Sequence, residues 1–146
     1  MNRMETANAL HEKGYNCCQC VLGAFVDRLG IPEETALRIG AGFGGGAGTG
    51  ELCGAITGAV MVMDLAANDD AKGDPVGAKR RASARSKKLQ ARFSERFGAL
   101  RCRELLRGEK EEPSEAVAAL GITNHCGVMI ASAVELVEEL LREEGL

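Results

Sequence analysis

The sequence predicts an all-α fold, a single-domain multi-helix bundle with one glycine-rich loop, and three observations support this. Segment after segment places apolar residues three or four positions apart, which is the spacing of one helix face. No segment alternates apolar and polar residues in the way that a half-buried strand does. Aromatic residues make up only 3% of the chain, so we expect a core of small and aliphatic side chains that favours close helix packing.

Length and composition indicate one domain over residues 1–146. The chain has 146 residues, of which 45% are hydrophobic, and a domain of this size can bury a core without disulfides or metal ions. The formal net charge is −3. Because nucleic-acid-binding domains carry a strong basic excess, we expect no nucleic acid as partner.

Capping and turn residues predict the first three helices. Asn16 is a suitable N-cap for the second helix, and Gly30 is a suitable end for it. Pro32 fits the first turn of the third helix, where a missing N–H group costs nothing. The expected helices cover residues 2–13, 17–29 and 32–39.

A glycine-rich loop is expected next, because seven of the eleven residues at 40–50 are glycine and glycine disfavours a helix. A phosphate-binding loop is not indicated, since no strand precedes the segment and no Gly-Lys-Ser/Thr sequence follows. A helix of small residues is expected over 51–67. Gly54 and Gly58 share one face of it, which allows another helix to cross closely.

The second half predicts a polar connector at 68–77, a charged turn ending at Pro113, and four more helices. The long helix carries a basic stripe, for which a solvated face is favoured over a docking surface for an acidic partner or nucleic acid. The stripe consists of Arg81, Arg85, Lys88 and Arg92. The helices cover residues 77–97, 101–107, 114–120 and 126–144. The last one has an inward apolar stripe of Ile130, Val134, Val137 and Leu141.

Six cysteines occur in a chain that we expect to be cytoplasmic. The first ten residues lack the apolar run of a secretion signal, and no apolar stretch is long enough to predict a membrane span. Stable disulfides are rare in the cytoplasm, so metal binding or redox chemistry is the favoured explanation.

Four of the cysteines lie in separate segments, each at or just inside the expected start of a helix: Cys17, Cys53, Cys102 and Cys126. The positive end of a helix dipole stabilises a thiolate, so we expect lowered pKa values and ionisable sulfurs there. The alternative is that these are small buried core residues, as unpaired cysteines often are.

The first segment also contains a CxxC pair, because Cys17 and Cys20 lie three residues apart. This is the spacing of dithiol oxidoreductases, but no βαβ pattern surrounds it, so Cys20 is interpreted as a core residue. Cys18 faces away from Cys17 on a helix and is expected to be a spectator. His125 precedes Cys126 and could serve as a ligand or base, although an ordinary packing role is favoured.

Together these segments resemble the C_GCAxxG_C_C family of redox-active proteins over roughly residues 14–141. The motifs that carry the resemblance are Gly14-Tyr15-Asn16-Cys17, Gly44-Gly45-Gly46, Cys53-Gly54-Ala55-Ile56-Thr57-Gly58-Ala59, Phe97-Gly98 with Cys102, and Cys126 before an acidic helix. Three positions depart from the usual pattern. Cys18 and Cys20 stand where small residues such as alanine are usual, and Asp64 stands where an uncharged small residue is common.

The resemblance implies that the four dispersed cysteines form one redox site, with an unidentified redox or transport-related protein as partner. For this site a metal centre, either an iron–sulfur cluster or zinc, is favoured over a metal-free dithiol/disulfide couple. Gly45, Gly46 and Gly54 are expected to bring backbone N–H groups to it. A thiol–disulfide oxidoreductase using Cys17 with Cys20 or Cys53, and a helical interaction module with inert thiols, are the alternatives. A homodimer is compatible with the sequence.

Overall fold

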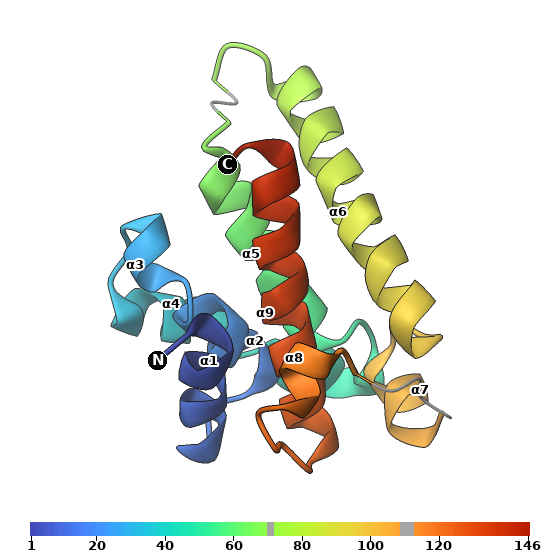
Figure 1. The fold of residues 1–146 in the computed structure, drawn as a ribbon. Coiled ribbons are helices and arrows are strands. Elements are labelled where there is room, and N and C mark those ends of the chain that lie inside the picture. The colour runs from blue at the N-terminus through green and yellow to red at the C-terminus, as the bar shows by residue number, and fades with distance from the viewer. Residues whose placement is uncertain (70–71, 109–112) are drawn as a thin grey trace.

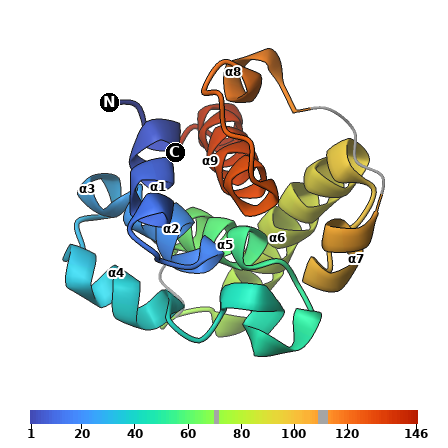
Figure 2. The same cartoon turned by 90° about the horizontal axis from the view of Figure 1, so that it is seen from below.

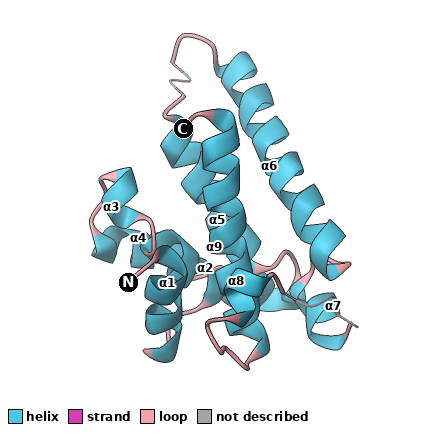
Figure 3. Cartoon of the chain, viewed as in Figure 1, coloured by secondary structure: helices cyan, strands magenta, loops and turns pink. Residues whose placement is uncertain are grey.

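The computed structural model describes residues 1–69, 72–108 and 113–146, and helices dominate these residues (Figures 1 and 3). The all-α prediction is confirmed. The helices are α1 (Arg3–Glu12), α2 (Cys17–Gly23), α3 (Val26–Leu29), α4 (Glu33–Gly40), α5 (Gly54–Ala67), α6 (Pro75–Phe97), α7 (Cys102–Arg107), α8 (Glu115–Ala118) and α9 (His125–Glu144). A short turn, η1 (Gly46–Gly50), lies in the glycine-rich loop.

The single helix expected over residues 17–29 is divided into α2 and α3, so that prediction is wrong. The Nη1 group of Arg3 donates a hydrogen bond of 2.8 Å to the carbonyl oxygen of Ala24. The same guanidinium lies 4.8 Å from the centre of the Phe25 ring, where a cation and an aromatic face attract each other. The helix is interrupted here because the Ala24 carbonyl oxygen accepts a hydrogen bond from Arg3 and Phe25 has a non-helical backbone (φ −115°, ψ 6°).

Helices α2 and α5 cross closely at Gly54 and Gly58, as the spacing of these glycines predicted. A Cβ atom at Gly58 would lie 2.9 Å from the carbonyl oxygen of Cys18 and 3.1 Å from the Cβ atom of Val21. A Cβ atom at Gly54 would lie 3.3 Å from the Cβ atom of Cys17. The two glycines therefore bring the start of α2 directly against the start of α5.

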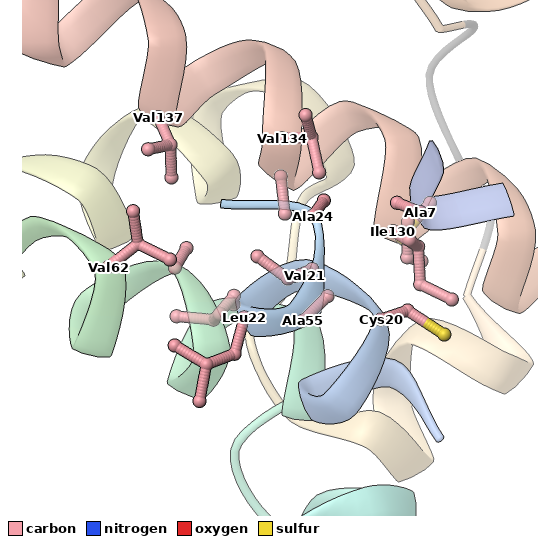
Figure 4. Close-up of a cluster of buried hydrophobic side chains, with 14 of the residues drawn as sticks. Ala7, Cys20, Val21, Leu22, Ala24, Ala55, Val62, Ile130, Val134 and Val137 are labelled. Carbon is pink, nitrogen blue, oxygen red and sulfur yellow. The ribbon is translucent and has the colours of Figure 1, made fainter. Parts of the chain in front are cut away.

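Helix α9 supplies one wall of the core, which Figure 4 shows in close-up. All four residues of its predicted inward stripe are buried, which confirms that interpretation. Val134 and Val137 face Val21 of α2 and Val62 of α5 in this cluster. Aliphatic packing of this kind fixes the relative positions of the three helices whose first turns carry Cys17, Cys53 and Cys126.

The basic stripe of α6 is paired with carboxylates of the same chain rather than simply solvated. Helix α6 runs beside α5 and α9 (Figure 1). Arg81 lies 2.6 Å from Asp69, and Arg85 lies 3.5 Å from Asp64. Lys88 is paired with Glu144, and Arg92 with Glu143. The stripe thus forms a row of intramolecular ion pairs along α6.

Two expected linkers fall partly outside the described residues, because 70–71 belong to the polar connector and 109–112 to the charged turn. Helix α6 begins at Pro75, two residues earlier than expected, since Asp74 caps it by accepting a 3.0 Å hydrogen bond from the Gly77 amide. None of the helices in the described part of the chain is both long and apolar enough to cross a membrane.

Candidate redox site

The four dispersed cysteines all lie at helix starts, as expected from the sequence. Cys17 is the first residue of α2, and Cys102 is the first residue of α7. Cys53 is the N-cap of α5, and Cys126 is the second residue of α9. The sequence predicted that α5 begins at Glu51, which is three residues before its observed start at Gly54.

Asn16 fixes the position of Cys17. Its Oδ1 atom accepts a 2.9 Å hydrogen bond from the Gln19 amide, and the Gln19 side chain bonds back to the Asn16 amide, which together form a capping box. Its Nδ2 group donates to the carbonyl oxygens of Gly40 and Ala41, at 3.2 and 3.1 Å. The N-cap of α2 is therefore also the contact that joins this helix start to the end of α4.

An isolated antiparallel bridge between Leu52 and Arg101 aligns Cys53 with Cys102. The Cys53 amide donates to the Leu100 carbonyl at 2.9 Å, and the Cys102 amide donates to the Glu51 carbonyl at 2.7 Å. Successive residues of extended chain point to opposite faces. Since each cysteine directly follows a bridged residue, both side chains leave the bridge on the same face.

The glycine-rich loop shapes the chain that leads into this bridge. Gly45, Gly46, Ala47 and Gly48 have consecutive φ values of 64°, 63°, 58° and 73°, a left-handed conformation that glycine adopts without steric cost. A Cβ atom at Gly46 would collide with the backbone of Glu51. Glycine is required at this point because the loop turns back onto the residue that pairs with Cys102.

The backbone amides that favour the Cys53 thiolate, and so oppose the rise in its pKa, are those of Ala55 and Ile56 in the first turn of α5. We had expected Gly45 and Gly46 to supply donors there, and the structure corrects this for Cys53. In the structure these two glycines form the loop turn. Gly54 instead lets the glycine-rich loop approach the start of α5, because a Cβ atom there would lie 2.7 Å from the carbonyl oxygen of Phe43.

Cys17 and Cys126 interact through their side chains, and this interaction raises the pKa of Cys17 more than any other neighbour does. Cys126 also contributes to the electrostatic environment of Cys53 and of Cys102. It is thus a common neighbour of the other three thiols. None of the six cysteines is joined in a disulfide in the structure.

The pKa values of Cys17, Cys53 and Cys102 are raised, which overturns the expectation that helix starts would lower them. The side-chain interaction with Cys126 raises the pKa of Cys17 most, followed by burial and by the neighbouring thiols. Burial raises the pKa of Cys53 to about 11, even though the amides of Ala55 and Ile56 oppose the shift. Burial also raises the pKa of Cys102. Desolvation of the charged form outweighs the helix dipole here.

The two additional cysteines of α2 lie in the core, and the core interpretation of Cys20 is confirmed. Cys20 is 0% exposed, packs near Ala7 and Ile130 (Figure 4), and donates its thiol to the Tyr15 carbonyl at 3.5 Å. Cys18 is also 0% exposed, and its sulfur lies 4.0 Å from that of Met61. Burial raises the pKa of Cys18 to about 11 and that of Cys20 to about 12.

We tested whether the described residues fit the metal centre favoured from the sequence. Across residues 1–69, 72–108 and 113–146, no group of three or more His, Cys, Asp or Glu side chains is arranged to hold a metal ion. The side chains as placed therefore do not form a ready-made ligand set. The Cys17–Cys126 contact is a two-sulfur arrangement, which suits a dithiol.

The fold and these thiols define an all-α protein with cysteines at the starts of four helices. A family model matches residues 15–140, and its description is "Putative redox-active protein (C_GCAxxG_C_C)". The chain belongs to this redox-active family, as its motifs had indicated. No curated protein and no solved structure matches the chain.

Proposed function

We propose that the protein is a metal-free thiol–disulfide redox protein in which Cys17 and Cys126 form the couple. The observation that carries this proposal is that these two partly exposed cysteines lie at the starts of α2 and α9 and interact through their side chains. Two neighbouring sulfurs form a disulfide when their side chains approach to about 2.05 Å. The proposed setting is the cytoplasm, where both thiols would rest in the reduced form.

The proposed half-reactions balance without a cofactor. A substrate disulfide RSSR is reduced to two RSH molecules while Cys17 and Cys126 lose two protons and two electrons and become joined. The reverse reaction regenerates both thiols when a dithiol donor takes up the disulfide bond. Exchange of this kind passes through a mixed disulfide, in which one protein sulfur is bonded to one substrate sulfur.

Disulfide mapping tests this proposal directly. The reduced protein is oxidised with diamide, the remaining thiols are alkylated, and the peptides are identified by mass spectrometry. We expect Cys17 to be linked to Cys126 while the buried Cys18 and Cys20 remain alkylatable only after unfolding. Oxidation that joins a different pair, or that leaves both Cys17 and Cys126 as thiols, would contradict the proposal.

A metal centre is the second candidate, because Cys126 is the electrostatic neighbour of Cys17, Cys53 and Cys102 together. Four thiolates around one centre are the usual ligands of iron–sulfur clusters and of structural zinc. This candidate requires all four sulfurs to approach one another further. It predicts stoichiometric metal and, for a cluster, visible absorption in anaerobically purified protein. It also predicts protection of the four cysteines from alkylation until a chelator is added.

A further inference from the structure

Helices α6 and α9 enclose a cavity of about 370 Å³ that is separate from the cysteines. The two helices lie side by side in both views of the ribbon (Figures 1 and 2). The lining of the cavity comes from the last turns of α6, the N-cap of α8 and the middle of α9, and no cysteine is among the residues that the structure places on it. A volume of this size falls within the range of small-molecule sites, which is about 300–1,000 Å³.

Glu135 joins the three elements that line this cavity. One of its carboxylate oxygens lies 2.9 Å from the Nη1 atom of Arg96 in α6. The other oxygen accepts a 2.8 Å hydrogen bond from the hydroxyl of Ser114, which is the N-cap of α8. Because both oxygens of Glu135 already have donors, this carboxylate fixes the shape of the cavity and is not available to a ligand.

Two further carboxylates line the cavity, those of Glu95 and Glu139. Both arginines of the lining are already in ion pairs with other glutamates. Across residues 1–69, 72–108 and 113–146, no cationic side chain lies within ion-pair distance of Glu95 or Glu139. The cavity therefore presents negative charge that is not neutralised locally, and negative charge attracts a cation.

The hydroxyl of Ser132 is an independent indication of a ligand. Ser132 lines the cavity and is only 3% exposed, and its Oγ atom has no hydrogen-bond partner among the described residues. An unsatisfied buried hydroxyl destabilises a fold, and alanine at this position would avoid that cost. The hydroxyl is therefore explained if a bound molecule supplies its hydrogen-bond partner. Phe93 and Phe97, which are also buried, give the same cavity an apolar wall.

From these features we infer that the cavity binds a small amine whose apolar body carries a hydroxyl group at its far end. Ser132, Leu136 and Glu139 follow one another on one face of α9, at spacings of four and three residues. Ser132 and Glu139 are about 10 Å apart along the helix axis. The ammonium group lies at Glu139, the apolar body lies against Leu136 and the two phenylalanines, and the hydroxyl bonds to Ser132. No cysteine takes part, so this inference is independent of the function proposed above.

Three related compounds test the two ends of this site separately in NMR titrations of the full chain. Tyramine has both the ammonium and the hydroxyl, phenethylamine lacks the hydroxyl, and tyrosol carries an alcohol in place of the ammonium. The variants are Ser132→Ala and Glu139→Gln. Glu138→Gln is the matched control, because Glu138 is the adjacent glutamate of α9 and lines a different cavity, beside Arg3.

We expect tyramine to bind with shifts centred on the amides of α6 and α9 that line the cavity. Phenethylamine and tyrosol should each bind about tenfold more weakly, because each lacks one polar contact. Ser132→Ala should remove the preference for tyramine over phenethylamine, and Glu139→Gln should remove the preference for tyramine over tyrosol. The affinities of Glu138→Gln should equal those of the unmodified chain.

Three results would overturn the inference. These are the absence of saturable shifts with tyramine at millimolar concentration, shifts centred on residues outside the cavity, and equal affinities for the three compounds. Retention of both preferences in Ser132→Ala and Glu139→Gln would overturn it as well. The spectrum of each variant without ligand shows whether the chain is folded, so a lost preference is distinguished from a lost fold.

Discussion

A Cβ atom at Gly58 would lie 2.9 Å from the carbonyl oxygen of Cys18, so α5 and α2 meet backbone to backbone one residue from Cys17. Glycine is used here because any side chain would push the two helices apart. The close approach couples the stability of the core to the geometry of the thiols. It follows that the packing glycines can be tested separately from the cysteines themselves.

We predict that Gly58→Leu destabilises the protein by about 1–3 kcal/mol or more, because the added side chain overpacks the α2–α5 crossing. Gly42→Leu is the matched control. It makes the same change at an exposed glycine where a Cβ atom would have no neighbour within 4 Å. Chemical denaturation measures both free energies of unfolding, and equal values for the two variants would refute the close crossing.

Asn16 and Asn2 offer a second matched comparison, since both are N-caps with a complete capping box. Only the Asn16 side chain also donates to the carbonyls of Gly40 and Ala41. Asn2→Ala should cost about 1 kcal/mol, the usual effect of losing a cap. Asn16→Ala should cost about 1–2 kcal/mol more, because two further carbonyls lose their donor. Similar losses for both variants would show that the contact with α4 contributes little.

The raised pKa of Cys20, about 12 against an ordinary 9.0, predicts a loss of stability in alkali. The folded chain binds this proton more tightly than the unfolded chain does. The contribution of the protonated Cys20 thiol to the free energy of unfolding is therefore complete below pH 9.0. It is lost as the pH rises from 9.0 to about 12. The slope reaches about 1.4 kcal/mol per pH unit for one thiol. Cys20→Ala should show a shallower decline than the parent in denaturation above pH 9, and parallel curves would exclude the effect.

Ser132 is buried, at 3% exposed, and its hydroxyl has no hydrogen-bond partner among the described residues. Burying an unsatisfied hydroxyl costs free energy, so Ser132→Ala should be neutral or stabilising by up to about 1 kcal/mol. Ser114→Ala is the contrasting variant, because that hydroxyl caps α8 and donates to Glu135 at 2.8 Å. It should destabilise by about 1 kcal/mol. Thermal unfolding of both variants measures this difference. A loss of stability in Ser132→Ala as large as that in Ser114→Ala would contradict the prediction.

Local sequence signals predicted much of the fold, because they act between residues that are close in the chain. Asn16 marked the start of α2 correctly, and the spacing of Ile130, Val134 and Val137 identified the buried face of α9. Gly54 and Gly58 indicated the helix crossing for the same reason. Each of these features depends on a cap or on a helical period, which a single segment of sequence contains.

Features that depend on distant partners could not be predicted in this way. The Leu52–Arg101 bridge consists of one residue pair, too short to leave an alternating pattern, so the start of α5 was placed too early. The break after α2 depends on Arg3, which lies in another helix. The pKa values were misjudged because a helix start can be recognised from sequence, whereas the burial that opposes it arises only from the tertiary structure.

The central claim is that Cys17 and Cys126 form a reversible two-electron couple, and an equilibrium redox titration tests it most directly. The protein is equilibrated in buffers of reduced and oxidised dithiothreitol, quenched with an alkylating agent, and the Cys17–Cys126 linkage is quantified by mass spectrometry. The account predicts one two-electron transition, retained in Cys18→Ala and abolished in Cys126→Ser. A transition that persists in Cys126→Ser, or the absence of any Cys17–Cys126 linkage across the series, would contradict it.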